Sequence, residues 1–371
     1  MEAEMVVRLA DYVASPLAFG THETYEALKD GKSCLRRYEG WQGVPEPFVA
    51  SLFPEDMLET ETEKDGITAD YTRFERLCIL TACRALAKVA VDASAVRTLF
   101  VLATTKGDIG TPLGHTATRI ARWFDNDVQP LVVCNACISG LHALIEAKRM
   151  LEVGLYDHVV VIGADLQTPF IVSGFLSLKA LSAEPCRPFD EDRTGLNLGD
   201  AAACIIMGRV ETVSPDMWQA VRGVVHNDAF HISSPSKQAE GCFRALKRVT
   251  EGFVPSDIDF VNLHGTATMY NDEMEAVGMW RARLTEVPAN SLKGYLGHTM
   301  GAAGIIETLI SMEGADDGLL LGTRGYRTQG ISRPLAVTNG HRPVRGRRFV
   351  KAISGFGGSN AAMLFEKGGR V

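Results

Sequence analysis

The chain has 371 residues, of which 46% are hydrophobic and 22% charged, the balance of a soluble globular protein with one large domain or two packed halves. The formal net charge of −7 argues against nucleic acid as the main partner, because phosphate binding needs a basic surface. No apolar run reaches the roughly 18 residues of a membrane span, and the acidic start, Met-Glu-Ala-Glu, is unlike a secretory signal. We therefore expect a cytoplasmic protein.

The cysteine pattern predicts reduced thiols. Eight cysteines are scattered through the chain, which is unlike a compact disulfide framework. The only close pairs are Cys78 with Cys83 and Cys134 with Cys137. No second pair of cysteines or histidines completes a zinc site, and we expect no metal ion.

Short apolar runs along the chain predict buried strands. The runs are continuous rather than alternating, which is typical of parallel strands covered on both faces. Helical patterns rich in small residues lie at 140–152 and 301–312, and small residues allow a helix to pack closely. The alternation of strands and helices predicts an α/β architecture. The predicted strands are 99–104, 158–163, 202–207, 260–263 and 349–353.

A faint repeat relates the two parts of the chain. The helical pattern after Cys137 leads to a strand that ends in Gly-Ala-Asp, and the pattern that begins at 301 leads to residues 318–322. Two similar halves would each contribute a reactive residue to a shared central cleft. No obvious linker separates them, so we expect one common core.

The first candidate for chemistry is Cys137, in the segment Cys134-Asn-Ala-Cys137-Ile-Ser-Gly140. An apolar run leads into a turn and then into a helical pattern. A cysteine at a helix N-terminus meets unpaired N–H groups and the positive end of the dipole, and both favour its thiolate. The turn also offers a backbone N–H as an oxyanion donor. The alternative is a buried, inert cysteine.

The second candidate is His264, at the end of an apolar run in the segment His264-Gly-Thr266-Ala-Thr268. Ligands of α/β proteins bind beyond the carboxyl ends of strands. Thr266 and Thr268 are two residues apart and would offer hydroxyls on the same side. We expect Asp272 and Glu275 to open the next helix and complement its dipole. A structural histidine is the alternative for His264.

Two glycine-rich segments complete the set. His298 lies among four glycines, and Lys293 precedes it by five residues. Glycines at such density indicate a close approach of the backbone to another group. Near the C-terminus, Gly355-Phe356-Gly-Gly-Ser-Asn360 follows an apolar run and could bring backbone amides to a reacting oxygen. A surface lysine and a plain loop are the alternatives.

Together these segments resemble the β-ketoacyl-acyl-carrier-protein synthases of the thiolase superfamily. That family carries Ala-Cys-x-x-Gly, Pro-Phe-Asp-x-x-Arg-x-Gly, His-Gly-Thr-x-Thr, Lys-x-x-x-Gly-His and Gly-Phe-Gly-Gly-x-Asn, in this order. The resemblance runs from Ser15-Pro16-Leu17 to Asn360-Ala361. The corresponding motifs here are Ala136-Cys137-Ile-Ser-Gly140, Pro188-Phe189-Asp190-Glu-Asp-Arg193-Thr-Gly195, His264-Gly-Thr266-Ala-Thr268, Lys293-Gly-Tyr-Leu-Gly297-His298 and Gly355-Phe356-Gly-Gly-Ser-Asn360.

The resemblance implies the thiolase-like fold, in which two pseudo-duplicated αβαβα halves form a five-layer α/β core. The N-terminal half would comprise residues 1–208 and carry the nucleophilic cysteine. The C-terminal half would comprise residues 209–371 and carry both histidines and the glycine-rich loop.

The resemblance also implies a reaction. Cys137 would accept an acyl group from a carrier-protein thioester, and malonyl carrier protein would then lose carbon dioxide and condense with it. His264 and His298 would stabilise the enolate, and Lys293 would hold the neighbouring histidine. The backbone N–H groups of Cys137 and Phe356 would form the oxyanion hole, with Phe356 as a gate. No metal or redox cofactor is expected, because the thioester already activates the carbonyl.

Substrate and partner contacts follow from the same resemblance. Thr266 and Thr268 would bind the phosphopantetheine arm of an acyl carrier protein. The carrier is acidic in such systems, so a basic rim is expected for docking, and a homodimer or a heterodimer with a related subunit is the family habit. The docking cations implied by position are Arg73, Arg76 and Lys179, with the cluster Arg342, Arg345, Arg347 and Arg348 as a second candidate. A solvated face is the alternative for either group.

The match departs from the family in two respects. The family often has Gly-Glu-Gly where this chain has Gly199-Asp200-Ala201, and several loops are trimmed, including the stretch 182–188. These departures favour a specialised ketosynthase, of a polyketide or aryl-polyene type pathway, over the housekeeping fatty-acid enzyme.

Two alternatives remain on the same fold. A non-catalytic partner subunit, like a chain-length factor, usually lacks the nucleophile, whereas this chain retains Cys137. A thiolase-type acyltransferase uses a second cysteine near the C-terminal glycine loop, and Gly355-Phe356-Gly-Gly-Ser-Asn360 contains none.

Overall fold

A computed structural model describes residues 4–231 and 234–369. Within these residues ten strands form the main sheet, in the order β11-β10-β14-β15-β9-β1-β8-β6-β4-β5. Residues 1–3, which hold most of the acidic start noted above, lie outside the described residues. The strands of this sheet are β1 (Met5–Ala14), β4 (Thr98–Ala103), β5 (Leu131–Val133), β6 (His158–Asp165), β8 (Ala201–Val210), β9 (Trp218–Asn227), β10 (Phe260–Asn262), β11 (Ala289–Asn290), β14 (Arg348–Gly355) and β15 (Ser359–Lys367).

The strand order repeats. Read in chain order, β1, β4, β5, β6 and β8 take the same relative places as β9, β10, β11, β14 and β15. The two sets meet through a single residue pair of β1 and β9, Val7 with Gln219. This is the duplicated arrangement expected of the thiolase-like fold. The limits 1–208 and 209–371 stay a prediction.

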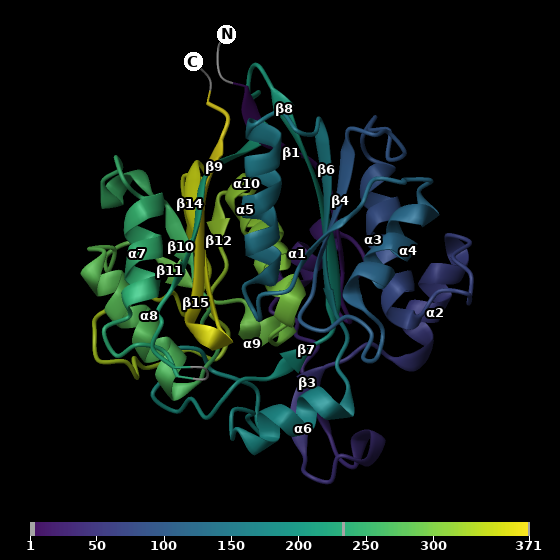
Figure 1. Ribbon diagram of the computed structural model, residues 1–371. Helices are drawn as coiled ribbons and strands as arrows, with labels where there is room; N and C mark the ends of the chain where they lie inside the picture. The colour runs from purple at the N-terminus through teal and green to yellow at the C-terminus, as the bar shows by residue number, and fades with distance from the viewer. Residues whose placement is uncertain (1–3, 232–233, 370–371) are drawn as a thin grey trace.

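The main sheet and its helices are stacked in layers, with helices outside and between the two sets of strands (Figure 1). Helices α7 and α8 cover the outer face of the C-terminal strands, α3 and α4 cover that of the N-terminal strands, and α5 and α10 lie between the two sets. Every strand set is therefore buried on both faces, which explains the continuous apolar runs. The helices are α1 (Thr21–Lys29), α2 (Glu55–Lys64), α3 (Arg73–Leu86), α4 (Leu113–Trp123), α5 (Ser139–Glu152), α6 (Pro169–Ser177), α7 (Glu240–Val249), α8 (Met269–Arg281), α9 (Lys293–Leu296) and α10 (Ala303–Asp316).

The small residues of α5 and α10 allow the central layer to be thin. A Cβ on Gly140 would lie 2.6 Å from the carbonyl oxygen of Gly301, and one on Gly304 would lie 2.3 Å from the backbone nitrogen of Leu141. Real Cβ atoms do not approach backbone so closely, so the two helices touch main chain to main chain. The close packing predicted from the small residues is confirmed.

Minor elements lie outside these layers. A three-stranded sheet and a two-stranded sheet flank the core, and four 3-10 helices occur in the connections of the described residues. They are β2 (Arg36–Tyr38), β3 (Phe48–Ser51), β7 (Leu198–Gly199), β12 (Leu319–Leu320), β13 (Arg342–Pro343), η1 (Trp41–Gly43), η2 (Pro255–Asp257), η3 (Met300–Ala302) and η4 (Phe356–Gly358).

One strand prediction needs correction, and one segment of the suggested repeat lies outside the main sheet. The run 202–207 belongs to β8, which is antiparallel to both β1 and β6, because burial on both faces gives a continuous apolar run whatever the strand direction. The run 318–322 contains only β12, which pairs with β13 outside the main sheet. The strand that takes the place equivalent to β6 is β14.

Two broader expectations can be compared with the structure. All eight cysteines are free thiols, as predicted. Within residues 4–231 and 234–369, none of the helices combines the length and the apolar character that crossing a lipid bilayer requires.

Candidate active site

Cys137 lies in the turn between β5 and α5. Ala136 has a φ of 46°, a left-handed conformation that costs an alanine roughly 1–2 kcal/mol. The turn is tied by hydrogen bonds, because the Ile138 N–H donates to the Asn135 carbonyl at 3.2 Å and the Ser139 hydroxyl donates to the Ala136 carbonyl at 2.6 Å. The strained, tied turn fixes the direction of the Cys137 side chain, which is buried.

Burial outweighs the expected stabilisation of the Cys137 thiolate. Burial raises the pKa of the Cys137 thiol to about 11, although Lys293 and the backbone N–H groups of Phe356 and of Cys137 itself act in the opposite direction. The sequence pattern shows the helix N-terminus but not the depth of burial, so the net direction of the pKa shift could not be predicted from it. At neutral pH Cys137 is therefore a thiol, and it becomes a thiolate only if another group accepts its proton.

His264 follows β10, in a turn held by two carboxylates. Glu275 accepts the backbone N–H of His264 on one oxygen and that of Gly265 on the other, both at 2.7 Å. Asp272 accepts the backbone N–H of Thr266 at 3.0 Å. Both acids lie in α8, as predicted, but their carboxylates bind the preceding turn rather than only complementing the helix dipole. The turn is thereby held rigidly against the helix.

His298 lies just after α9, and its tautomer follows from its contacts. The backbone N–H of Met300 donates to His298 Nδ1 at 3.3 Å, so the proton of the neutral ring is on Nε2. The following turn is fixed from the other half of the molecule, because the Gly301 N–H donates to Asp165 at the end of β6, at 2.8 Å. His298 therefore presents a hydrogen-bond donor from a fixed position.

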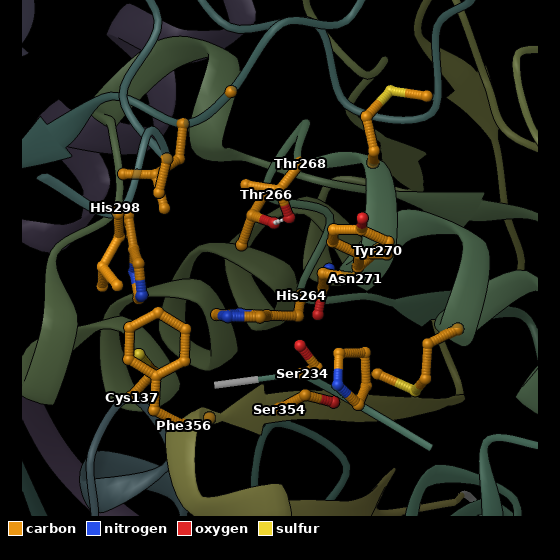
Figure 2. A pocket seen from close by; sticks show the side chains of 18 of the residues that line it. Cys137, Ser234, His264, Thr266, Thr268, Tyr270, Asn271, His298, Ser354 and Phe356 are labelled. Carbon is orange, nitrogen blue, oxygen red and sulfur yellow. Dashed lines mark hydrogen bonds between the residues drawn. The ribbon is translucent and has the colours of Figure 1, made fainter. Parts of the chain in front are cut away.

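The three residues meet in one pocket (Figure 2). Cys137 Sγ and one nitrogen of each histidine lie within 4.8 Å of one another, and the two imidazole centroids are 4.9 Å apart at an interplanar angle of 82°. Among the described residues, His264 Nδ1 and His298 Nε2 have no hydrogen-bond partner although both atoms are buried. Unpaired buried donors and acceptors are costly unless a ligand uses them.

The pocket has a volume of about 310 Å³ and opens to the surface. Thr266 and Thr268 line it, and their hydroxyl oxygens lie 2.9 Å apart, so they face the same side as the two-residue spacing predicts. Met269, Tyr270 and Phe356 also line the pocket and are exposed. A ligand entering here would pass an apolar rim and two hydroxyls before reaching the sulfur.

The glycine-rich loop closes the pocket from the C-terminal half. A Cβ on Gly355 would lie 3.2 Å from the backbone nitrogen of Cys137, so the loop contacts the nucleophile turn directly. The backbone N–H groups of Phe356 and Cys137 both act on the Cys137 sulfur. The Phe356 ring stacks on Phe175, with 5.7 Å between centroids. Two backbone N–H groups therefore lie next to the Cys137 sulfur.

Lys293 does not line the pocket. It is 1% exposed, and its ammonium group donates to Glu307 at 2.6 Å. Burial and then Lys293 lower the pKa of both His264 and His298 well below the usual value, so both rings are neutral near pH 7. Lys293 acts on the histidines through its charge, and sequence reasoning missed its partner Glu307.

The comparisons with known proteins decide the family. The N-terminal domain of β-ketoacyl synthase matches residues 103–212, and its C-terminal domain matches residues 220–326. The chain belongs to the β-ketoacyl synthase family. Two similar curated proteins are the 3-oxoacyl-[acyl-carrier-protein] synthases 2 of Rhizobium meliloti and Vibrio cholerae. The first is 30% identical over 259 residues, with 63% of this chain and 60% of the relative covered, and the second is 32% identical over 257 residues, with 64% and 62% covered.

Solved structures of β-ketoacyl synthases share the fold over nearly the whole chain. A ketosynthase from Xenorhabdus doucetiae, in complex with its chain length factor, has a TM-score of 0.83 and 23% sequence identity, with 98% of both chains covered. Against the curated relatives named above, by contrast, the chain spans only about 60% of their length.

Asp200 is the position at which the sequence differs from the Gly-Glu-Gly motif named above, and the structure accommodates the aspartate. The carboxylate is buried and accepts backbone N–H groups from Gln167 at 2.6 Å and from Phe53 at 3.0 Å. Burial raises the pKa of Asp200 to about 6. Both oxygens have a partner, and Asp200 does not line the pocket, so the shorter side chain leaves the site intact.

The cations expected to bind a carrier protein lie in different places. Lys179 is exposed at the pocket mouth, and the described residues offer it no ion-pair partner. Arg73 and Arg76 both contact Glu59, at 3.4 and 3.5 Å, and neither lines the pocket. Lys179 is therefore the cation of this set that lies at the pocket mouth.

The second arginine cluster is also away from the pocket lining. Arg345 pairs with Asp259 at 2.6 Å, and Arg348 pairs with Glu366 at 2.5 Å. Intrachain pairing of this kind is typical of a solvated structural face. A docking role for the cluster Arg342, Arg345, Arg347 and Arg348 stays a prediction.

Proposed function

We propose that the chain is a β-ketoacyl-acyl-carrier-protein synthase, which joins a cysteine-bound acyl group to malonyl carrier protein by decarboxylative Claisen condensation. The observation that carries the proposal is the pocket itself. A buried thiol faces two neutral imidazoles, and two backbone N–H groups point at the sulfur. Membership of the family supports the same reaction.

The first half-reaction loads the enzyme. Cys137 Sγ attacks the thioester carbonyl of the acyl carrier, the oxyanion accepts hydrogen bonds from the N–H groups of Cys137 and Phe356, and the pantetheine thiolate leaves. His298 Nε2 already carries a proton and can only donate towards the pocket. His264 has no partner at Nδ1 that fixes its tautomer, so we assign it as acceptor of the thiol proton and donor to the leaving sulfur.

The second half-reaction forms the carbon–carbon bond. Malonyl carrier protein loses carbon dioxide, and the enolate oxygen accepts hydrogen bonds from His264 and His298. The nucleophilic carbon attacks the acyl carbonyl on Cys137, and the C–S bond breaks to leave the Cys137 thiolate. The thiolate takes a proton from water as the β-ketoacyl carrier leaves, which regenerates the thiol. Lys293 assists from behind the histidines. The thioesters supply the activation, so the proposed reaction calls for no metal or redox cofactor.

Carrier binding is assigned to the pocket mouth. Thr266 and Thr268 would bind the phosphopantetheine arm, and Lys179 would contact the acidic carrier protein. Lys179→Glu should raise the KM for acyl carrier protein severalfold but leave the reaction with acyl pantetheine unchanged, since the free thioester has no protein surface to dock. Equal effects on both substrates would remove Lys179 from the docking surface. Arg73 and Arg76, paired with Glu59, should have smaller effects.

The assembly and the pathway are the finer parts of the proposal. We propose a dimer, either of this chain with itself or with a related subunit, because β5 is an edge strand directly before the nucleophile turn. We propose the cytoplasm as the compartment, which cell fractionation would test. The trimmed loops and Asp200 favour a polyketide or aryl-polyene type substrate. A preference for saturated fatty chains among defined acyl carriers would contradict this assignment.

The alternatives explain the pocket less well. A non-catalytic partner subunit has no use for a nucleophile beside two unpaired imidazole nitrogens. A thiolase-type acyltransferase would need a second cysteine at the glycine loop, where the chain has Ser359.

The deciding experiment is acylation followed by extension. The purified protein is incubated with carriers that bear candidate acyl chains, and the acylated residue is located by peptide mass spectrometry. Cys137→Ala should abolish acylation, whereas Cys134→Ala, three residues away and exposed, should not. Malonyl carrier protein should then yield the β-ketoacyl product. Acylation only after addition of a second subunit would indicate a heterodimer, and no acylation of Cys137 under any condition would refute the assignment.

A further inference from the structure

A second buried lysine lies behind the histidine pair. Lys351 is in the middle of β14 and is 0% exposed, in a strand whose other central residues are apolar. Removing a charged ammonium group from water costs several kcal/mol, so such a group is retained only where it is paired and hydrogen-bonded. The sequence run 349–353 was interpreted as an apolar strand, and this lysine was overlooked.

All three hydrogens of the Lys351 ammonium group have acceptors. Nζ donates to Glu307 Oε2 at 2.5 Å, to Asn262 Oδ1 at 2.7 Å and to the Leu263 carbonyl at 3.4 Å. The Asn262 side chain is held in turn by Asn290, at 2.8 Å. The ammonium group is therefore fully hydrogen-bonded to three oxygen acceptors and is shielded from solvent.

These contacts connect Lys351 to the site at two points. Asn262 and Leu263 are the two residues directly before His264, at the end of β10. Glu307 is shared, since one of its oxygens binds Lys351 and the other binds Lys293. Lys293, Lys351 and the Glu307 carboxylate together carry one net positive charge behind the imidazoles. Without Lys351, the charges of Lys293 and Glu307 would cancel.

We propose that Lys351 is a positioning residue for the decarboxylation step, which supplies this net charge behind His264 and His298 and holds the strand end that carries His264. The inference rests on the proposed condensing activity and assigns a residue to it. The charge keeps both rings neutral, so that they donate hydrogen bonds to the enolate, and it attracts the enolate's own negative charge. Acyl transfer depends less on it, because that oxyanion lies on backbone amides.

The titratable groups around the pair agree with this role. Cys137 lies within 4.8 Å of both rings, and Glu275 of α8 accepts the backbone N–H of His264. Glu307 of α10 pairs with both lysines. After burial, Lys293 and Lys351 are among the causes that lower the pKa of both histidines. Burial lowers the pKa of Lys351 itself to about 8, against the opposing effect of Glu307.

The test separates the two half-reactions. Carbon dioxide release from malonyl carrier protein and acylation of Cys137 are measured from pH 6 to 9.5 for the wild type and for Lys351→Met, with Lys367→Met, a partly exposed lysine of the neighbouring strand, as control. Lys351→Met should lose at least tenfold in decarboxylation and less than threefold in acylation. The acid limb of its pH profile for decarboxylation should move to higher pH, because the loss of a nearby cation raises the pKa of the histidines.

A second variant guards against a purely structural explanation. Lys351→Met combined with Glu307→Gln restores one net positive charge, now on Lys293, because it removes the carboxylate that neutralises Lys293 in the single variant. We expect the double variant to recover most of the decarboxylation rate. The acid limb of its pH profile should return to the wild-type position. Unchanged decarboxylation in folded Lys351→Met, or a loss that the double variant does not recover, would overturn the proposal. A wild type that neither acylates nor decarboxylates would instead refute the proposed function.

Discussion

The shared carboxylate of Glu307 gives the sharpest prediction about stability. Burial alone would raise the pKa of Glu307, but Lys293 and Lys351 outweigh it and hold that pKa below its usual value. The Glu307 side chain is 4% exposed and its partners 1% and 0%. In Glu307→Gln, one side of the amide must present N–H donors to an ammonium group. Two buried cations also lose the anion that pairs with both of them.

The magnitude follows from the cost of leaving a buried charge unpaired. Breaking a buried ion pair by removing one partner costs about 3–5 kcal/mol. For a chain of 371 residues the unfolding entropy is about 0.8 kcal/mol/K, so the melting temperature should fall by roughly 5 °C. Glu366→Gln, which removes the partner of Arg348 from a partly exposed pair, should cost under about 1 kcal/mol.

Calorimetry of both variants at pH 7 would measure the difference. The reasoning also predicts that Lys351→Met added to Glu307→Gln recovers part of the loss, because one of the two unpaired cations disappears. Equal melting temperatures for Glu307→Gln and Glu366→Gln would refute the claim that this cluster is a tightly coupled buried network.

Three further predictions concern the site and the central helices. Alkylation of Cys137 by iodoacetamide should accelerate about tenfold per pH unit from pH 7 to 10, since its pKa is about 11, and a plateau near pH 8.5 by peptide mass spectrometry would contradict this. Gly140→Ala should cost about 1–3 kcal/mol in urea unfolding through its clash with Gly301, whereas Gly174→Ala, with open space in α6, should be neutral or stabilising. Burial raises the pKa of Glu275 from 4.5 to about 7, so the folded state binds its proton more tightly and the unfolding free energy should fall as pH rises through this window. Glu275→Gln should flatten that slope.

Much of the fold could be predicted from the sequence because its signals are local. The apolar runs that became β4, β6 and β10 were located to within a few residues, and the small residues of 140–152 and 301–312 predicted the close central helices. Strand direction could not be predicted for β8, since burial on both faces produces the same run in either direction. The family resemblance, rather than periodicity, predicted the duplicated topology.

For the site, too, the sequence predicted the residues that lie in short motifs but not the properties that depend on distant parts of the chain. The motifs brought Cys137, His264, His298 and Phe356 forward, and these residues line one pocket. The pKa of Cys137 depends on how deeply the whole fold buries it, which no local pattern contains. Lys351 did carry a signal, a lysine inside an otherwise apolar strand, but its partner Glu307 lies 44 residues away in sequence.

The main-chain contact between α5 and α10 limits which substitutions the molecule can accept. Side-chain packing can be rebuilt by compensating substitutions, but a contact of backbone on backbone has no rotamers to adjust. Cys137 and His298 precede these two helices. Substitutions in the surrounding core should therefore change the distance between the two residues little. The exposed residues Met269 and Tyr270 at the mouth are under no such restriction. Substitutions can therefore change the entrance of the pocket more easily than the spacing of Cys137 and His298.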